Sequence, residues 1–128
     1  MTLLLDASAL LAYLLDEPGA DLIDDRLHES AISSVNLGEV ATRVAARGGD
    51  PRDVIDEVLD SGLDVYEFTF TNSVRLMDVN TLERRWGITL SLGDRCCLAT
   101  AMAEDLPVLT ADREWTRFAD LLDVRLIR

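Results

Sequence analysis

Short, continuously apolar runs alternate along the chain with longer segments in which apolar residues recur every three or four positions. A continuous apolar run predicts a strand that is buried on both faces of a sheet. The runs that predict strands are residues 2–5, 31–33, 65–68, 107–110 and 124–127. The first run stops at an aspartate, Asp6, which is the first acidic residue of the chain.

The longer segments have the period of amphipathic helices, and turn residues bound several of them. Proline follows Asp50 at the first position of one helix, and glycine follows the longest segment at Gly87. The predicted helices are residues 9–15, 20–28, 37–47, 51–61, 72–86, 95–104 and 114–121. Strands that alternate with helices in this way predict an α/β fold with a mainly parallel sheet.

The length and composition fit one folded domain spanning residues 1–128. The chain has 128 residues, of which 48% are hydrophobic and 28% charged, an ordinary mix for a globular protein. The longest uncharged stretch, residues 7–15, is far shorter than the roughly 20 residues of a membrane-spanning helix. No basic residue precedes the first apolar run, so we expect no signal peptide and a cytoplasmic location.

The charge balance excludes several kinds of chemistry. The net charge is −12, from 24 acidic and 12 basic residues, and every basic residue is an arginine. Without lysine the chain has neither a phosphate-binding P-loop nor a Schiff-base nucleophile. A strongly acidic protein is not a general nucleic-acid binder, so any contact with RNA must be local, through a few arginines or through metal ions.

Cysteine and histidine offer little further chemistry. The two cysteines, Cys96 and Cys97, are adjacent, which makes a disulfide between them unfavourable and predicts two small buried side chains. No cysteine or histidine has the spacing of a zinc site. The single histidine, His28, lies in an acidic stretch and is expected at the surface, so catalysis here is expected to proceed without histidine.

Four acidic residues occupy equivalent places relative to the predicted strands. Asp6 ends the first strand and Asp112 follows the fourth, while Glu39 and Asp94 are each expected in the first turn of a helix. In a parallel sheet such positions meet at the carboxyl edge. Carboxylates packed together repel one another, and a divalent cation relieves that repulsion. An all-oxygen set of ligands favours magnesium or manganese over zinc.

Each acid taken singly also has an ordinary structural explanation. Acidic residues are favoured in the first turn of a helix because they meet free backbone N–H groups and the helix dipole. Asn36 with Glu39, and Ser91 with Asp94, have the spacing of capping boxes. The metal-site interpretation therefore depends on all four acids sharing one edge of the sheet.

The segments around these acids resemble the signature blocks of a known family. Residues 3–8 (Leu-Leu-Leu-Asp-Ala-Ser), 36–40 (Asn-Leu-Gly-Glu-Val), 90–94 (Leu-Ser-Leu-Gly-Asp) and 109–113 (Leu-Thr-Ala-Asp-Arg) are similar to those of PIN domains. Their order, their spacing and the length of the chain resemble VapC, the toxin half of a toxin–antitoxin pair. The resemblance implies a PIN-like three-layer sandwich, with a mainly parallel five-stranded sheet and helices on both faces, and a homodimer.

The same resemblance implies an activity and a set of site residues. It implies a Mg²⁺-dependent endoribonuclease, with Mn²⁺ as a substitute, in which one or two ions activate water for hydrolysis of the phosphodiester bond. The residues implied to form the catalytic and metal site are Asp6, Glu39, Asp94 and Asp112. The first, third and fourth are expected to be direct ligands, whereas Glu39 is either a ligand or a base that orients the water.

Four further residues beside the acids have two interpretations each. Ser8 and Thr110 match positions whose hydroxyls assist the site, or they are a helix cap and a strand end. Arg95 and Arg113, each next to a site acid, either contact the substrate phosphate or are solvated charges.

The resemblance and the charge also imply a partner. Without the four site acids the chain still has 20 acidic residues against 12 basic ones, a net charge of −8. We therefore expect a VapB-like antitoxin that is basic where it meets the site, with an arginine that pairs with the carboxylates. The first two helices carry leucines and an isoleucine that either form a groove for a partner helix or pack in the core: Leu10, Leu11, Leu14, Leu22 and Ile23.

Three other classes of protein are alternatives to the nuclease. A receiver domain needs paired acids after the first strand and a late lysine, and this chain has one acid there and no lysine. A phosphatase of the haloacid dehalogenase type needs Asp-x-Asp, whereas residues 6–8 are Asp-Ala-Ser. The third alternative is a degenerate PIN domain that acts as a non-catalytic RNA- or protein-binding module. The presence of all four acids favours the enzyme, while the RNA that it cleaves is not identified by the sequence.

Overall fold

The centre of the molecule is a five-stranded sheet in the order β3-β2-β1-β4-β5, in which every neighbouring pair of strands is parallel. The computed structural model describes all 128 residues. The strands are β1 (Leu3–Leu5), β2 (Ser30–Ser33), β3 (Asp64–Tyr66), β4 (Val108–Thr110) and β5 (Val124–Leu126). The predicted parallel five-stranded sheet is therefore confirmed, with β1 at its centre.

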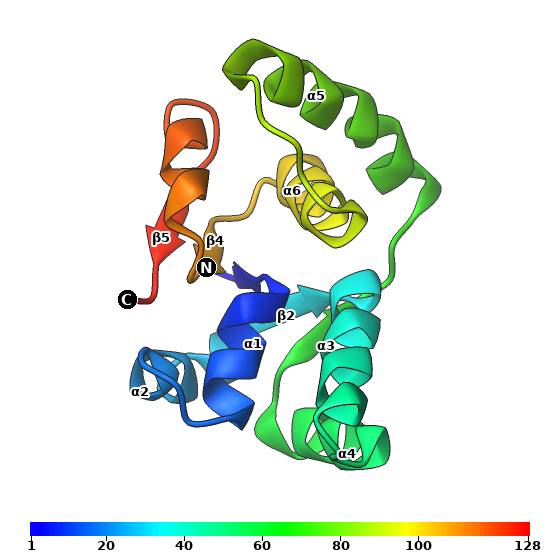
Figure 1. Cartoon of the computed structure of the whole chain (residues 1–128), viewed down its shortest axis with the longest axis vertical. Coiled ribbons are helices and arrows are strands. Elements are labelled where there is room, and N and C mark those ends of the chain that lie inside the picture. The colour runs from blue at the N-terminus through cyan, green and yellow to red at the C-terminus, as the bar shows by residue number, and fades with distance from the viewer.

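Helices cover both faces of this sheet. The helices are α1 (Ala7–Leu14), α2 (Ala20–Asp24), α3 (Ser34–Ala46), α4 (Pro51–Ser61), α5 (Phe70–Trp86) and α6 (Leu92–Glu104). Two 3₁₀ helices, η1 (Leu27–Glu29) and η2 (Arg113–Phe118), complete the order of elements. Helices α1 to α4 lie on one side of the sheet and α5 and α6 on the other, as Figure 1 shows. This arrangement confirms the predicted three-layer sandwich.

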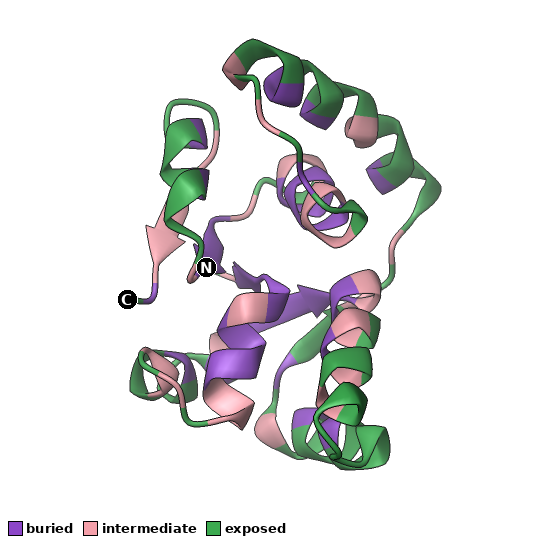
Figure 2. Ribbon diagram, in the orientation of Figure 1, coloured by how far each residue is buried: buried purple, intermediate pink, exposed green.

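The two faces of the sheet belong to two separate hydrophobic cores, because successive residues of a strand point to opposite faces. Leu3 and Leu5 of β1 pack in the core beneath α1, while Leu4 between them packs in the core beneath α6. All three are nearly inaccessible to solvent, and buried residues concentrate on the sheet and the inward sides of the helices (Figure 2). This double burial explains why the strands are continuously apolar in sequence.

One predicted helix boundary is wrong in a way that matters for the site. The helix predicted over residues 37–47 begins at Ser34, capped by the hydroxyl of Ser33, which accepts a hydrogen bond from the N–H of Val35 at 3.3 Å. Glu39 therefore lies in the second turn of α3 instead of the first, and Asn36 and Glu39 form no capping box. The strand β2 leads straight into the helix, which leaves no loop residue for a later start.

Other differences are local. The helix predicted over residues 20–28 ends at Asp24 and is followed by η1, because the chain must become extended again at Ser30 to enter β2. The helix predicted over residues 114–121 is the 3₁₀ helix η2, and α6 begins at Leu92, ahead of the predicted residue 95. The proline at the start of α4 and the left-handed Gly87 that ends α5 are confirmed.

The remaining small predictions also hold. Cys96 and Cys97 are buried and unpaired, and His28 is exposed. The chain contains no helix with the length and apolar character needed to cross a membrane.

Candidate functional site

Asp6 stands at the point where β1 passes into α1. Its backbone is extended, its N–H donates to the carbonyl of Leu109 on β4 at 3.1 Å, and its Oδ1 accepts from the N–H of Ala9 at 2.9 Å. The carboxylate thus caps α1 while it sits at the carboxyl edge of the sheet. Only 4% of Asp6 is exposed, so its charge is held almost out of contact with solvent.

Two hydroxyls contact this buried carboxylate, one on each oxygen. Ser8 Oγ donates to Asp6 Oδ1 and Thr110 Oγ1 donates to Asp6 Oδ2, both at 2.6 Å. The same hydroxyl oxygens accept from the backbone N–H groups of Ala111, at 2.9 Å, and Asp112, at 3.0 Å. These four hydrogen bonds connect the end of β1 with the end of β4. The hydroxyls of Ser8 and Thr110 are therefore hydrogen-bond donors to the Asp6 carboxylate.

The pKa of Asp6 is raised from its usual 3.8 to about 6. Burial is the largest cause, because it removes water from the charged form. Hydrogen bonds from Ser8, Thr110 and the backbone of Ala9 lower the pKa, and the charge of Asp94 raises it further. No cation contributes, so this corner of the protein is short of positive charge.

Asp94 interacts electrostatically with each of the other three acids. It lies in the first turn of α6, where its N–H donates to Ser91 Oγ at 3.1 Å, as the capping interpretation predicts. Its pKa is raised chiefly by burial, then lowered by the Ser91 hydroxyl, raised by the charges of Glu39 and Asp112, and lowered by Arg43. Asp94 therefore lies near the other three acids.

Glu39 differs from the other acids because a cation contacts it. Arg43 Nη2 donates to Glu39 Oε2 at 2.9 Å, and Asn36 Nδ2 donates to Glu39 Oε1 at 3.2 Å. The spacing of Asn36 and Glu39 predicted a capping box instead of this side-chain contact, and the contact with Arg43 was not predicted. The spacing of Glu39 and Arg43, four residues apart on one helix, was the signal that pointed to the ion pair.

Asp112 is the most open of the four acids. It is exposed and caps η2, with its Oδ1 accepting from the N–H of Glu114 at 3.0 Å. Asp112 therefore caps a helix and is also one of the four candidate site acids, as Asp6 is.

The four acids share one edge, but they do not close around a common point. No three acidic, histidine or cysteine side chains lie close enough together to hold one metal ion. The chemistry of the donors nevertheless suits a hard divalent cation, because all are oxygens and no ion pair neutralises Asp6, Asp94 or Asp112. A cation here would supply the positive charge that the buried carboxylate of Asp6 lacks.

The two arginines proposed to contact substrate have different surroundings. Arg95 donates from Nε and Nη2 to the two carboxylate oxygens of Glu83, at 2.9 and 3.1 Å. Arg95 is therefore engaged with Glu83 instead of being a solvated charge, and its contact with the substrate stays a prediction. Arg113 is exposed and forms no ion pair, so it remains available beside Asp112.

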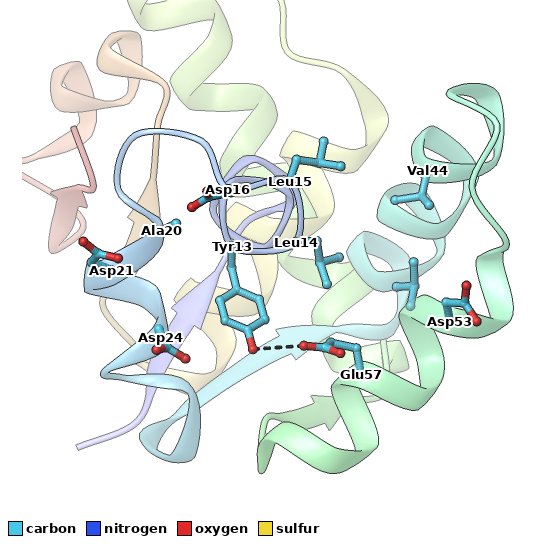
Figure 3. A pocket seen from close by; sticks show the side chains of 11 residues that line it. Tyr13, Leu14, Leu15, Asp16, Ala20, Asp21, Asp24, Val44, Asp53 and Glu57 are labelled. Atoms are coloured by element: carbon cyan, nitrogen blue, oxygen red, sulfur yellow. Dashed lines mark hydrogen bonds between the residues drawn. The ribbon is translucent and has the colours of Figure 1, made fainter.

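A separate groove of about 570 Å³ opens between α1, α2 and the α3–α4 pair. Its floor is apolar and its rim is acidic, with no basic residue, and Tyr13 donates from its hydroxyl to Glu57 at 3.1 Å (Figure 3). The lining residues are Tyr13, Leu14, Leu15, Asp16, Ala20, Asp21, Asp24, Val44, Asp53, Val54 and Glu57.

Of the five residues predicted to form a partner groove or to pack in the core, only Leu14 lines this groove. Leu10, Leu11 and Ile23 are buried in the core, and Leu22 is exposed outside the groove. The groove that the structure shows is therefore made largely by other residues.

Comparison with known proteins identifies the family. The sequence profile of the PIN domain family matches residues 3–121. No curated protein matches the sequence.

Several solved structures share the fold. VapBC2 from Rickettsia felis, bound to a DNA fragment of the promoter, superposes with a TM-score of 0.79 at 18% identity, covering 98% of both chains. DNA-bound VapBC from Salmonella typhimurium gives a TM-score of 0.77 at 17% identity, covering 100% of this chain and 99% of the other. VapC20 from Mycobacterium tuberculosis, a toxin that cleaves the sarcin–ricin loop, gives 0.71 at 16% identity, covering 96% and 98%.

Proposed function

The chain belongs to the PIN domain family, and we propose that it is a Mg²⁺-dependent endoribonuclease that acts in the cytoplasm as the toxin of a VapBC-type toxin–antitoxin pair. The observation that carries the proposal is the buried carboxylate of Asp6, which has hydroxyl and backbone partners but no cation. Three further acids share its edge of the sheet. A site with this shortage of positive charge favours a divalent cation, Mg²⁺ or its substitute Mn²⁺.

Asp6, Asp94 and Asp112 are the residues that would hold the ion. A bound Mg²⁺ supplies positive charge to the scissile phosphate and activates water for hydrolysis. Ser8 and Thr110 use their protons to orient the two oxygens of Asp6, at 2.6 Å each. The burial of Asp6 excludes bulk water from this side of the site, which strengthens the attraction between the carboxylate and a cation.

The open side of the site is where an RNA strand would approach. Asp112 and Arg113 are both exposed there, at the start of η2. Arg113 has no carboxylate partner and is therefore the arginine that we assign to the substrate phosphate. Glu39 is either a ligand of the ion or a base that orients the attacking water.

Cleavage of RNA by the purified chain tests this proposal. We expect cleavage with Mg²⁺ or Mn²⁺ and none with EDTA. Asp6→Asn and Asp94→Asn should each lower the rate by about a hundredfold or more, because each removes a ligand charge from the site. Circular dichroism should show the parental helix content in both variants. An Asp6→Asn protein that cuts RNA as fast as the parent would place the activity elsewhere.

The same assay addresses the alternative of a degenerate PIN domain. Such a binding module would retain RNA or a protein partner while cutting nothing at any concentration of Mn²⁺. It would also behave identically with and without the Asp6→Asn change, since no catalysis depends on that carboxylate.

The acidic groove supports the antitoxin part of the proposal. Its apolar floor and its rim of Asp and Glu side chains suit an amphipathic helix with basic flanks. An arginine of the same partner, reaching the site acids, would take the place of the cation. The solved VapBC structures are complexes of this kind of toxin with its antitoxin.

Expression in cells tests the toxin role separately from the nuclease. The chain alone should arrest growth, while co-expression with the neighbouring small gene should restore growth and yield a complex that purifies together. If a protein that cleaves RNA in vitro does not slow growth when it is expressed, the toxin role is contradicted and the nuclease activity stands. The homodimer stays a prediction, for which the exposed stripe of Phe70, Val74 and Met77 on α5 is an available apolar surface.

A further inference from the structure

Gly93 lies directly against the carboxylate of Glu39. A Cβ atom at Gly93 would stand 2.6 Å from Glu39 Oε1 and within 3.0 Å of the other two carboxylate atoms, closer than real contacts allow. Gly93 has no positive φ, so its backbone conformation is open to any residue. The space taken by the Glu39 carboxylate, and not the conformation of the chain, therefore requires glycine at the residue before Asp94.

Asn36 holds the same carboxylate from the other side. It is 1% exposed, and its Nδ2 donates both to Glu39 Oε1, at 3.2 Å, and to the carbonyl of Gly93, at 2.9 Å. The reverse orientation of the amide would set its oxygen against two acceptors, so the hydrogen bonds fix which way it points. The buried side chain of Asn36 thus connects Glu39 on α3 with the first turn of α6, which contains Asp94.

These contacts account for the position of Glu39 in detail. Asn36 holds Oε1, Arg43 holds Oε2 at 2.9 Å, and Gly93 provides the surface on which the carboxylate rests. Arg43 is half exposed, whereas Asn36 and Gly93 belong to the packed contact between α3 and α6. Asn36, which is buried, is therefore the fixed part of the arrangement.

We propose that Asn36 and Gly93 are positioning residues that hold the Glu39 carboxylate beside Asp94 as a ligand of the divalent cation. The inference rests on the metal-dependent function proposed above. A ligand carboxylate that is free to turn on a helix surface loses affinity for its ion, and partners that orient a ligand contribute about 10- to 100-fold in metal affinity. Glu39 therefore acts as a ligand because of the residues around it.

Gly93→Ala separates this role from any effect on folding. The added methyl group meets only the end of a flexible side chain, so the carboxylate moves aside and the helix gains in intrinsic propensity. We expect Mn²⁺ binding, measured by electron paramagnetic resonance and calorimetry, to weaken about tenfold while the melting temperature stays equal or rises. Gly38→Ala is the matched control, because Gly38 lies in α3 next to Glu39 with open space around it.

Asn36→Ala tests the same position by a second route. It should weaken Mn²⁺ binding by a similar factor, whereas Asn72→Ala should leave it unchanged, although Asn72 is an equally buried asparagine in α5. Both effects must act through Glu39, so neither change should weaken binding further once Glu39→Gln is present.

The outcomes are distinct. Parental Mn²⁺ affinity in Gly93→Ala and Asn36→Ala, or an equal further loss in the Glu39→Gln background, overturns the inference and leaves the metal site in place. A parent that binds no Mn²⁺ overturns the proposed function and the inference with it. Selective loss in the two variants, with both controls unchanged, supports the inference.

Discussion

Asp6 and Glu83 are two carboxylates with little exposed surface, 4% and 9%, but Asp6 is packed much more deeply, and their pKa values move in opposite directions. Asp6 lies at the carboxyl edge of the sheet among hydroxyls, backbone N–H groups and other acids, and its pKa is raised. Glu83 lies on α5, where the guanidinium of Arg95 holds its pKa below the usual value despite the opposing effect of burial.

The difference follows from two causes, the deeper burial of Asp6 and the guanidinium that contacts Glu83. Both oxygens of Glu83 accept hydrogen bonds, from Arg95 and from the N–H of Leu90, and these contacts join α5 to the segment before α6. Asp6 has its hydrogen bonds but no positive charge. A buried acid that lacks a cation, and whose acidic neighbour Asp94 raises its pKa further, is the one expected to bind something.

The largest expected effect is on the stability of the metal-free protein. The rise in the pKa of Asp6 from 3.8 to about 6 corresponds to roughly 3 kcal/mol of lost stability at pH 7. Asp6→Asn removes that charge, so at pH 7 in EDTA the free energy of unfolding, measured by urea titration, should rise by up to this amount. Glu83→Gln should lower it, because Arg95 then loses its charged partner.

The dependence on pH should differ in the same way. A raised pKa means that folded Asp6 holds its proton longer than the unfolded chain does, so its contribution to stability falls as the pH rises from about 4 to about 6. A lowered pKa means that Glu83 contributes stability above the usual value near 4.5, which is lost as the pH falls through its lower folded value. Equal responses to both substitutions would contradict the comparison.

The second prediction concerns added metal ion. At a hundred times its dissociation constant an ion that binds only the folded state adds about 2.7 kcal/mol, or roughly 10 °C in melting temperature for a chain of this size. The parent and Glu83→Gln should both show this rise with Mn²⁺ in a thermal melt, starting from different temperatures. Asp6→Asn should show little of it, and a full rise in that variant would place the ion away from Asp6.

The smallest effect expected is on RNA affinity, and it compares the two arginines that follow site acids. In the Asp6→Asn background, which should not cut RNA, Arg113→Gln should reduce the dependence of log K on log salt by about 0.7, as expected for one lost phosphate contact. Arg95→Gln should leave that slope unchanged and lower the melting temperature instead, because its partner is Glu83. Fluorescence anisotropy over a series of salt concentrations measures both slopes.

Much of the fold was predictable because its signals are local. Continuous apolar runs identified the strands, and residues such as Pro51 and Gly87 marked the ends of helices. The boundary at Ser34 was not predictable from periodicity, since β2 passes into α3 without a loop and the apolar pattern does not change there. The early end of α2 was missed for a related reason: its sequence allows a longer helix, and the need to enter β2 ends it.

The positions of the four candidate acids along the fold were predictable, but their contacts were not. The places of Asp6 and Asp112 after central strands follow from a parallel sheet, whatever its details. The contact of Arg43 with Glu39 was missed, Asn36 was paired with Glu39 only as a capping box, and the ion pair of Arg95 with Glu83 was not predicted. Nothing in the order of residues distinguishes an arginine that turns toward Asp94 from one that turns toward Glu83.

The sequence by itself thus determined the class of fold, the edge of the sheet at which acids collect, and the oxygen chemistry of that edge, because strands, caps and charges are encoded by neighbouring residues. Only the tertiary structure decided that Glu83 has a cation and that Asp6 has none. The decisive contacts join Glu83 to a residue 12 positions away and Asp6 to one 104 positions away. Contacts over such separations form only when the packed layers bring the elements together, and the pKa of each carboxylate follows from them.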